Sequence, residues 1–347
     1  MKIYTSNTLR IATAALAAVG MLAAPTASLA AEKVVRINLG TLAPSGSVYH
    51  QSLQLMAEQW RQAPGGGVSL KVFSDGTQGS EADMVKLMNT GNLQAGLLTA
   101  VGLSKIEPGI GGLQNVPMIF NDLTEFDAVK EKLRPMLEKR MEEKGYVVLF
   151  WADTGWVRYF SKQPVLVPDD LKKMKMFAWA GNLDQLDIMR KHGYTPVPVE
   201  TTDILISLKT GMIDTTAAPP IWALAGQLAT SAPHMLNLNW APLVGACVVR
   251  KTAWDKIPEA TRAALLPAAA KAGADMQTKG RKEGEDAVTA MKERGLIVHE
   301  VTPELDAQFR AAAEKLYPDF RGRIVPADIF DEVVRLVKEG RTAGGKK

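Results

Sequence analysis

The sequence predicts an α/β fold made of two similar lobes, and three observations carry that prediction. Segments with strand and helix patterns alternate from residue 34 to about residue 154 of the 347-residue chain. The same alternation starts afresh near residue 157, and the chain after residue 250 becomes mainly helical. Strands that alternate with helices form mostly parallel sheets with helices on both faces. We therefore expect two mostly parallel sheets, one in each lobe.

The first half of the chain contains four strand patterns and three helix patterns. The expected strands are 34–39, 68–73, 94–99 and 146–151, and the expected helices are 47–61, 81–90 and 123–144. Ser80 is a favoured N-cap residue, and Asp83 adds negative charge in the first turn, where the helix dipole favours it. Gly91 follows the last helical residue, as is typical of a helix C-terminus.

The second half repeats this organisation and then changes to helices. The expected strands are 157–160, 175–177, 195–199 and 213–217, the expected helices are 182–192 and 203–210, and 243–249 would be a return strand. A long helix is expected over 259–293, with Pro267 as a kink or a restart. A further helix should begin at Pro303, with Thr302 as its cap.

These segments predict how the chain divides. We expect a signal peptide at 1–30, a first lobe from 31–154 plus about 243–285, and a second lobe from 155–242 plus about 286–340. The tail 341–347 is polar and rich in Gly, so we expect it to be disordered.

The first thirty residues have the features of a secretory signal. Lys2 and Arg10 supply positive charge, 11–24 is apolar, and Ser28-Leu29-Ala30 provides small residues for cleavage after Ala30. An uncleaved anchor is the alternative, but the apolar run is shorter than the ~20 residues that a spanning helix needs. We expect a mature chain of 317 residues in the periplasm.

Charge and cysteine content narrow the class of protein further. Removing Lys2 and Arg10 from the 41 basic residues leaves a formal charge of +2 against 37 acidic residues. This balance does not favour nucleic acid as a partner. The single cysteine, Cys247, excludes an internal disulfide and lies in an apolar run, so we interpret it as a small buried hydrophobe. We expect a monomer.

No motif for catalysis, metal binding or a cofactor stands out in the sequence. There is no Walker loop, no His-Glu-x-x-His and no Gly-x-Ser-x-Gly, and the four histidines are scattered without metal-ligand spacing. Gly109-Ile110-Gly111-Gly112 is glycine-rich but lacks the dinucleotide fingerprint and a clear preceding strand, so we interpret it as a loop. We expect a protein that is not an enzyme and carries no cofactor or metal.

Three segments together resemble a known receptor family. They are Thr41-Leu42-Ala43-Pro44-Ser45-Gly46-Ser47, then Gly155-Trp156-Val157-Arg158 leading to Pro168-Asp169-Asp170-Leu171-Lys172, and Leu208-Lys209-Thr210-Gly211-Met212-Ile213-Asp214. Their order and spacing resemble the DctP-type substrate-binding proteins of tripartite ATP-independent periplasmic (TRAP) transporters, over essentially the whole mature chain. The resemblance implies a bilobal periplasmic-binding-protein-like fold, a ligand cleft between the lobes and a long helix spanning both. It also implies delivery of a small molecule to TRAP membrane permease subunits.

The resemblance also exposes a difference at the expected binding site. Family members that bind organic acids place an arginine where this chain has Phe177, with assisting asparagines where it has Ala180 and Ala218. A guanidinium clamps a carboxylate through two parallel hydrogen bonds. We therefore expect the usual acid clamp to be missing.

Aromatic residues are the expected replacement. Trp156, Phe177, Trp179, Trp222 and Trp240 fall in the second lobe at strand ends or nearby loops, and Tyr49 and Trp151 come from the first lobe. Any one tryptophan could simply belong to the core. As a group, they predict a hydrophobic, aromatic or amphiphilic ligand, with lobe closure around it.

Alternatives remain open at this point. Arg158 could hold a small organic acid, or it could form a structural ion pair with Asp153 or Asp170. Asn182 is expected to cap its helix, and Asp75 and Glu81 are expected to serve as turn and first-turn residues. A periplasmic hydrolase with dispersed catalytic residues and an accessory protein without a permease are further alternatives.

Overall fold

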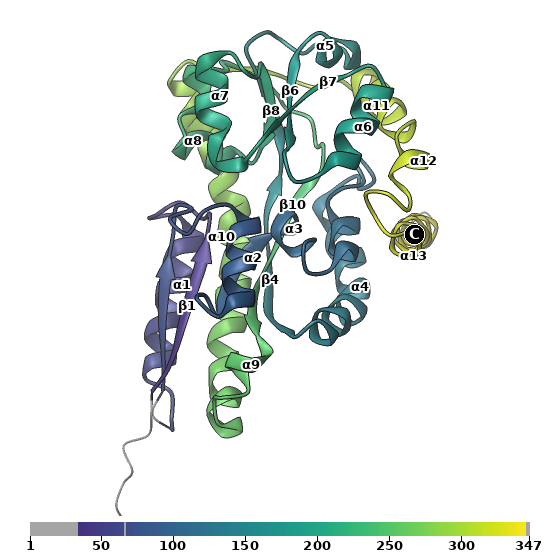
Figure 1. Ribbon diagram of the computed structural model, residues 1–347. Coiled ribbons are helices and arrows are strands. Elements are labelled where there is room, and N and C mark those ends of the chain that lie inside the picture. Colours follow the sequence, from purple (N-terminus) through teal and green to yellow (C-terminus); the bar gives the residue numbers. More distant parts are fainter. Residues whose placement is uncertain (1–33, 66, 345–347) are drawn as a thin grey trace, which may run out of the picture. The chain divides into compact units, whose positions relative to one another are not determined.

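The computed structural model describes residues 34–65 and 67–344 (Figure 1). The predicted signal peptide and the cleavage site after Ala30 lie outside the described residues. Among the residues that are described, no helix combines the length and the apolar character needed to cross a membrane.

Helices and strands alternate as the sequence predicts. The strands are β1 (Val35–Thr41), β2 (Val68–Phe73), β3 (Ala95–Thr99), β4 (Tyr146–Trp156), β5 (Arg158–Ser161), β6 (Lys175–Trp179), β7 (Thr195–Val199), β8 (Thr215–Ala218), β9 (His234–Leu236), β10 (Pro242–Arg250) and β11 (Ile297–His299). The α-helices are α1 (Val48–Arg61), α2 (Glu81–Thr90), α3 (Ala100–Leu103), α4 (Leu123–Glu143), α5 (Pro168–Lys172), α6 (Leu183–Lys191), α7 (Ile204–Thr210), α8 (Pro220–Ala225), α9 (Lys251–Trp254), α10 (Glu259–Glu293), α11 (Pro303–Glu314), α12 (Tyr317–Phe320) and α13 (Ala327–Gly344). The 3₁₀ helices are η1 (Pro108–Leu113), η2 (Thr201–Asp203) and η3 (Leu228–Thr230).

The strands form two sheets. The first has the order β2-β1-β3-β10-β4, and the second has the order β11-β9-β5-β8-β6-β7. We call each sheet, with the helices packed on it, the first and the second lobe. In the first sheet only β10 runs against its neighbours, and in the second only β5 does. The prediction of two mostly parallel sheets is therefore confirmed, and the return strand is the antiparallel β10.

Local sequence accounts for the ends of several helices. Ser47 accepts a hydrogen bond from the His50 amide and starts α1. Ser80 and Asp83 form a capping box at the start of α2, which ends at Gly91 with a φ of 81°. Only glycine adopts such a left-handed conformation readily. Asn182 accepts a hydrogen bond from the Gln185 amide, which confirms it as the cap of α6.

The long helix α10 is continuous from Glu259 to Glu293 and includes Pro267 without a restart. It runs beside β4 and contacts α1 in the first lobe and α8 in the second (Figure 1). Gly273 and Gly280 allow this packing. A Cβ at position 273 would lie 2.8 Å from Phe150 Cβ, and a Cβ at position 280 would clash with the Tyr49 hydroxyl. The expected helix spanning both lobes is therefore present.

The C-terminal segment differs from the expectation. Helix α13 continues through Gly344, so residues 341–344 are helical instead of forming a disordered tail. Arg341 pairs with Glu125 at 2.7 Å and donates to the Ile119 carbonyl. Although 286–340 was assigned to the second lobe, α13 packs on α4 and η1, because its apolar side chains join the core around Leu133 and Leu137.

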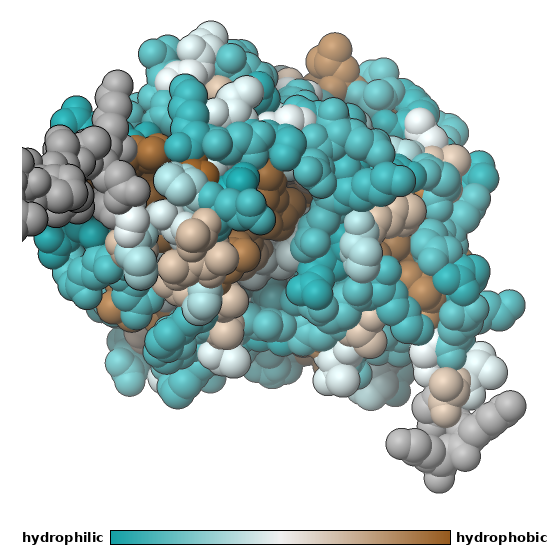
Figure 2. All heavy atoms as spheres, turned by 90° about the horizontal axis from the view of Figure 1, so that it is seen from below, coloured by the Kyte–Doolittle hydropathy of each residue, from teal (hydrophilic) through white to brown (hydrophobic). Residues whose placement is uncertain are grey.

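Buried apolar side chains stabilise the interior of each lobe. The first sheet has a core on each face, and Cys247 is buried without a disulfide in one of them, as expected. Burial raises the pKa of the Cys247 thiol, so this thiol stays protonated at neutral pH. On the face seen in Figure 2, hydrophilic side chains predominate and most hydrophobic ones lie in recesses between them.

Candidate functional site

A cavity of about 290 Å³ lies between residues of the two lobes. The first lobe contributes residues from α3 and from the segment after η1, and the second lobe contributes the ends of β6 and β8. Ligands of open α/β sheets bind beyond the carboxyl ends of the strands, which is where β3, β6 and β8 end here. This cavity is therefore the candidate binding site.

No Asp, Glu, Lys, Arg or His side chain of the described residues lines this cavity. The titratable groups in its wall are the phenols of Tyr159 and Tyr194. Burial raises the pKa of both phenols, and nearby charges of Lys172 and Asp169 add smaller effects at Tyr194. Both phenols stay neutral at physiological pH, so the cavity wall carries no side-chain charge.

The end of β6 forms an aromatic part of the wall. Phe177 and Trp179 both line the cavity. Trp179 Nε1 donates to Glu200 Oε2 at 3.2 Å, which fixes the indole ring. Gly181 is needed beside it, since a Cβ there would lie 2.5 Å from Trp179 Cζ2. The Trp179-Ala180-Gly181-Asn182 sequence thus places an indole at the rim and a cap at the start of α6.

Further apolar side chains line the second-lobe wall, which also includes the polar residues Asn182, Gln185, Thr201, Thr215 and Thr216. Tyr159 and Trp240 pack edge to face with ring centroids 5.3 Å apart, and Trp222 and Ala218 also line the cavity. Phe309 of α11, Leu316 just before α12 and Phe320 of α12 also line the cavity, and the sequence reasoning did not select them. A wall of this composition favours an apolar ligand with a few orienting polar contacts.

The first lobe contributes four polar side chains to the cavity wall. Thr99, Ser104, Gln114 and Asn115 line it there. Thr99 caps α3 through Oγ1, and its amide and hydroxyl donate to Glu81 at 2.7 and 2.6 Å. Glu81 is buried and also accepts from the Gly102 amide, so its role extends beyond the first turn of α2.

The predicted site residues divide into two groups. Phe177, Trp179, Ala218, Trp222 and Trp240 line the cavity, and the structure brings them together. The remaining ones do not line it. Tyr49 donates to the Asp153 carbonyl at 2.9 Å, and Trp151 donates to Glu138 Oε1 at 2.9 Å in the core of the first lobe.

Trp156 and Ala180 also lie outside the cavity wall. Trp156 is buried beside a separate surface recess that it shares with Arg281 and Glu285. The Ala180 amide donates to the Val199 carbonyl at 3.1 Å, which extends the pairing between the ends of β6 and β7.

Arg158 is buried and does not line the cavity. Its Nε donates to Asn237 Oδ1 at 2.8 Å, and its Nη2 lies 3.7 Å from Glu285 Oε1. Its partners are therefore not the expected Asp153 or Asp170. Nη1 is buried without a hydrogen-bond partner among the described residues. Burial lowers the pKa of Arg158, while Glu285 and Glu300 oppose that effect.

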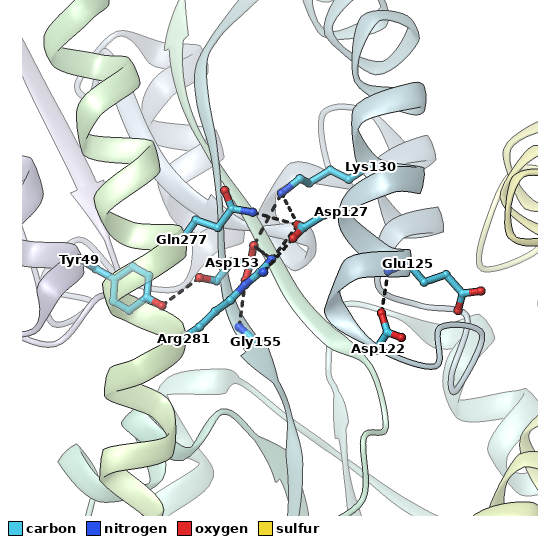
Figure 3. Close-up of polar contacts among 9 residues, drawn as sticks. All are labelled: Tyr49, Asp122, Glu125, Asp127, Lys130, Asp153, Gly155, Gln277 and Arg281. Atoms are coloured by element: carbon cyan, nitrogen blue, oxygen red, sulfur yellow. Dashed lines mark hydrogen bonds and ion pairs between the residues drawn. The ribbon is translucent and has the colours of Figure 1, made fainter. Parts of the chain in front are cut away.

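A cluster of paired charges lies apart from the cavity, where α4, β4 and α10 meet. Figure 3 shows Arg281 between Asp127 and Asp153, with Lys130 beside both carboxylates. Arg281 makes two hydrogen bonds to Asp127 and two to Asp153, all of 2.7–2.8 Å. Lys130 Nζ is 3.1 Å from Asp127 and 3.7 Å from Asp153. We call these four residues the Arg281 cluster.

The side chain of Lys105, in the first lobe, reaches the second lobe beside the cavity. Lys105 Nζ lies 4.5 Å from the centroid of the Trp179 ring and donates to the Gly181 carbonyl at 3.0 Å. Lys105 itself does not line the cavity. Its contacts with Trp179 and Gly181 therefore connect the first lobe to the second lobe beside the cavity.

The described residues contain no group of three His, Cys, Asp or Glu side chains placed to hold a metal. The wall residues that the sequence reasoning missed include Val101, Ser104, Gln114 and Asn115. A signal for the first two was available, because they follow the carboxyl end of the predicted strand 94–99. Gln114 and Asn115 follow a glycine-rich 3₁₀ helix and carry no such signal.

Comparison with protein-family models matches residues 39–323 to the DctP model, described as bacterial extracellular solute-binding protein, family 7. A curated relative, the C4-dicarboxylate-binding periplasmic protein DctP of Rhodobacter capsulatus, is 25% identical over 75% of this chain and 78% of its own. A solute-binding protein of Roseobacter denitrificans is also 25% identical, over 74% of this chain and 79% of its own.

Solved structures share the fold. The sugar acid binding protein DctPAm from Advenella mimigardefordensis, in complex with galactonate, matches with a TM-score of 0.81 and 18% identity, over 88% of this chain and 99% of that one. A TRAP periplasmic solute-binding protein from Sulfurospirillum deleyianum, with bound succinate, matches with a TM-score of 0.79 and 19% identity, over 87% and 98%.

Proposed function

The chain belongs to family 7 of the bacterial extracellular solute-binding proteins, the DctP family, and from this premise we propose that it captures a neutral, largely apolar small molecule. The ligand would bind in the cavity between the lobes and be delivered to the membrane permease of a TRAP transporter. Export to the periplasm, after cleavage near Ala30, is part of the same proposal.

The observation that carries the proposal is the uncharged wall of the cavity. Its side chains include Phe177, Trp179, Trp222 and Trp240 and no ionised group among the described residues. A carboxylate moved from water into this cavity would lose its hydration without gaining a cation, which costs several kcal/mol. An apolar molecule instead gains about 25 cal/mol for each Å² of apolar surface buried, less the cost of ordering.

The binding mechanism follows from the placement of the wall on both lobes. Ligand contacts with Trp179 in the second lobe and Val101 in the first would favour the arrangement in which the lobes meet. Lys105 adds a direct contact between the two rims. We therefore infer hinge closure around the ligand, as in other two-lobed receptors.

Calorimetric titration with matched probes tests the proposal. 2-Ethylnaphthalene and 2-naphthoate share a bicyclic skeleton and differ in charge, and succinate is the ligand bound in one structural relative. We expect the neutral probe to bind at least about tenfold more tightly than either anion, a difference of ~1.4 kcal/mol. Tighter binding of 2-naphthoate or succinate would contradict the proposal.

The export part has its own test. Osmotic shock should release the protein with the periplasmic fraction, and its N-terminal sequence should begin at Ala31. Retention with the cytosol, or an intact Met1, would contradict it.

A second candidate function is binding of a small organic acid through Arg158. The buried Nη1 of Arg158 without a partner favours it, and the relatives from Advenella and Sulfurospirillum hold galactonate and succinate. Arg158→Ala separates the two candidates. A large loss of affinity for the bound ligand would support the acid, whereas unchanged affinity in a folded variant would dismiss it.

A further inference from the structure

One corner of the cavity holds three polar side chains whose hydrogen-bonding capacity is only partly used within the described residues. Ser104 follows α3, and Gln114 and Asn115 follow η1, so all three come from the first lobe. They face a cavity whose opposite wall is mainly apolar. We call these three residues the polar corner.

The hydroxyl of Ser104 is the most informative member. Its Oγ is buried and has no hydrogen-bond partner among the described residues. Leaving such a group unsatisfied costs about 1–3 kcal/mol. Because Ser104 lines the cavity, a bound ligand can supply the missing partner.

Asn115 lies next to this hydroxyl. A Cβ on Gly111 would be 2.9 Å from Asn115 Nδ2 and 3.5 Å from Ser104 Oγ, so the two polar groups flank one bare Cα. Within the described residues the Asn115 side chain makes no hydrogen bond, although its amide donates to the Gly111 carbonyl. Glycine at position 111 therefore leaves room for both polar groups.

Gln114 determines which kind of partner the corner accepts. Its Oε1 already accepts a hydrogen bond from the Val244 amide at 2.9 Å, in the antiparallel strand β10. Its remaining hydrogen-bonding group is the NH₂, which only donates. With the Ser104 hydroxyl and the Asn115 amide beside it, the corner is rich in donors and uncharged.

From this arrangement we infer that the polar corner binds a carbonyl oxygen, of ketone or ester type, at one end of an otherwise apolar ligand. The inference rests on the proposed function, because it assigns the polar end of a ligand in the same cavity. A carbonyl accepts hydrogen bonds and donates none, which matches the donors offered. It carries no charge, which matches the absence of a cation in the described wall.

Titration calorimetry with 2-acetylnaphthalene, 2-ethylnaphthalene and 2-naphthoate tests this inference on the full mature chain. The ketone should bind roughly 3- to 10-fold more tightly than the hydrocarbon, the size of one neutral hydrogen bond. Ser104→Ala and Asn115→Leu should each reduce that preference, measured as the ratio of the two affinities within each variant. Ser207→Ala is the matched control, because Ser207 is buried and does not line the cavity.

The outcomes separate this inference from the proposed function. Equal binding of ketone and hydrocarbon, or a preference that persists in both corner variants, would overturn the carbonyl assignment alone. Binding of 2-naphthoate in preference to both neutral probes would instead overturn the proposed function. Binding of 2-ethylnaphthalene serves as the folding control, because a misfolded variant would no longer bind this hydrocarbon either.

Discussion

The Arg281 cluster and the interlobe cavity use polar side chains in opposite ways. In the cluster, two cations and two carboxylates satisfy one another, and Asp153 also holds the Gly155 amide at 3.1 Å (Figure 3). In the cavity no described side chain is charged, and Ser104 Oγ has no hydrogen-bond partner among the described residues. Charge therefore fixes the junction of α4, β4 and α10, whereas the unsatisfied neutral groups of the cavity are those available to a ligand.

The largest expected effect comes from removing the centre of the cluster. Arg281→Ala leaves Asp153, whose side chain is fully buried, without its main partner. Breaking a buried pair in this way costs about 3–5 kcal/mol in the free energy of unfolding. Urea unfolding measures it. Arg262→Ala on the same helix is the control, because its exposed pair with Asp255 should contribute about 0–1 kcal/mol. Equal losses in both variants would remove the distinction.

Placing a charge in the cavity wall should change which ligands the protein binds. Phe177→Arg puts a guanidinium into a wall that has no counter-charge, so neutral ligands should lose affinity. We expect more than about tenfold weaker binding of 2-acetylnaphthalene and stronger binding of 2-naphthoate, with ~1.4 kcal/mol for each tenfold change. Phe177→Leu, which keeps the site apolar, should cost less. An arginine variant with unchanged ligand preference would show that Phe177 does not control selectivity.

A smaller effect is expected at the rim contact. Lys105→Met removes the contact with the Trp179 ring and the hydrogen bond to Gly181. An exposed cation–π pair contributes about 0.5–1 kcal/mol, so ligand affinity should fall roughly two- to fivefold. Lys86→Met, on the exposed side of α2, is the matched control. Unchanged affinity in Lys105→Met would mean that this contact does not support closure.

The smallest expected effect is a change in how the free energy of unfolding depends on pH. Burial alone would raise the pKa of Asp127, but hydrogen bonds and charge from Arg281 and Lys130 lower it overall. A carboxyl with a lowered folded pKa stabilises above its unfolded pKa of about 3.9, and that contribution is lost as pH falls through the folded pKa. Asp127→Asn should therefore destabilise the protein more at pH 7 than at pH 3, by urea unfolding. The same cost at both pH values would contradict this assignment.

Much of the fold follows from local sequence patterns. The strand 68–73 and the cap residues Ser80 and Asn182 are where the patterns place them, because these depend on neighbouring residues. The start of α7 was less accessible to such patterns, since Thr201–Asp203 forms a 3₁₀ turn and α7 starts at Ile204, not at residue 203, without a side-chain cap. The pairing of β10 between β3 and β4 depends on contacts between distant segments, which local patterns encode only weakly.

The site was predictable only in part. Residues at strand ends, such as Phe177 and Trp222, could be selected because parallel strands bring their carboxyl ends together. Tyr49 lies on a helix, and its direction depends on the packing of α1 against α10, which buries its hydroxyl against Asp153. The aromatic side chain of Phe309 reaches the cavity only because α11 packs beside α5.

A neutral and largely apolar ligand in the cavity should be found among the molecules that the protein retains on purification. Native mass spectrometry of protein purified from its own cells, followed by solvent extraction, would give the mass and polarity of that ligand. The uncharged wall around Phe177 predicts a neutral molecule with a ring system or hydrocarbon chain. A small carboxylic acid without a ring or chain would contradict the account.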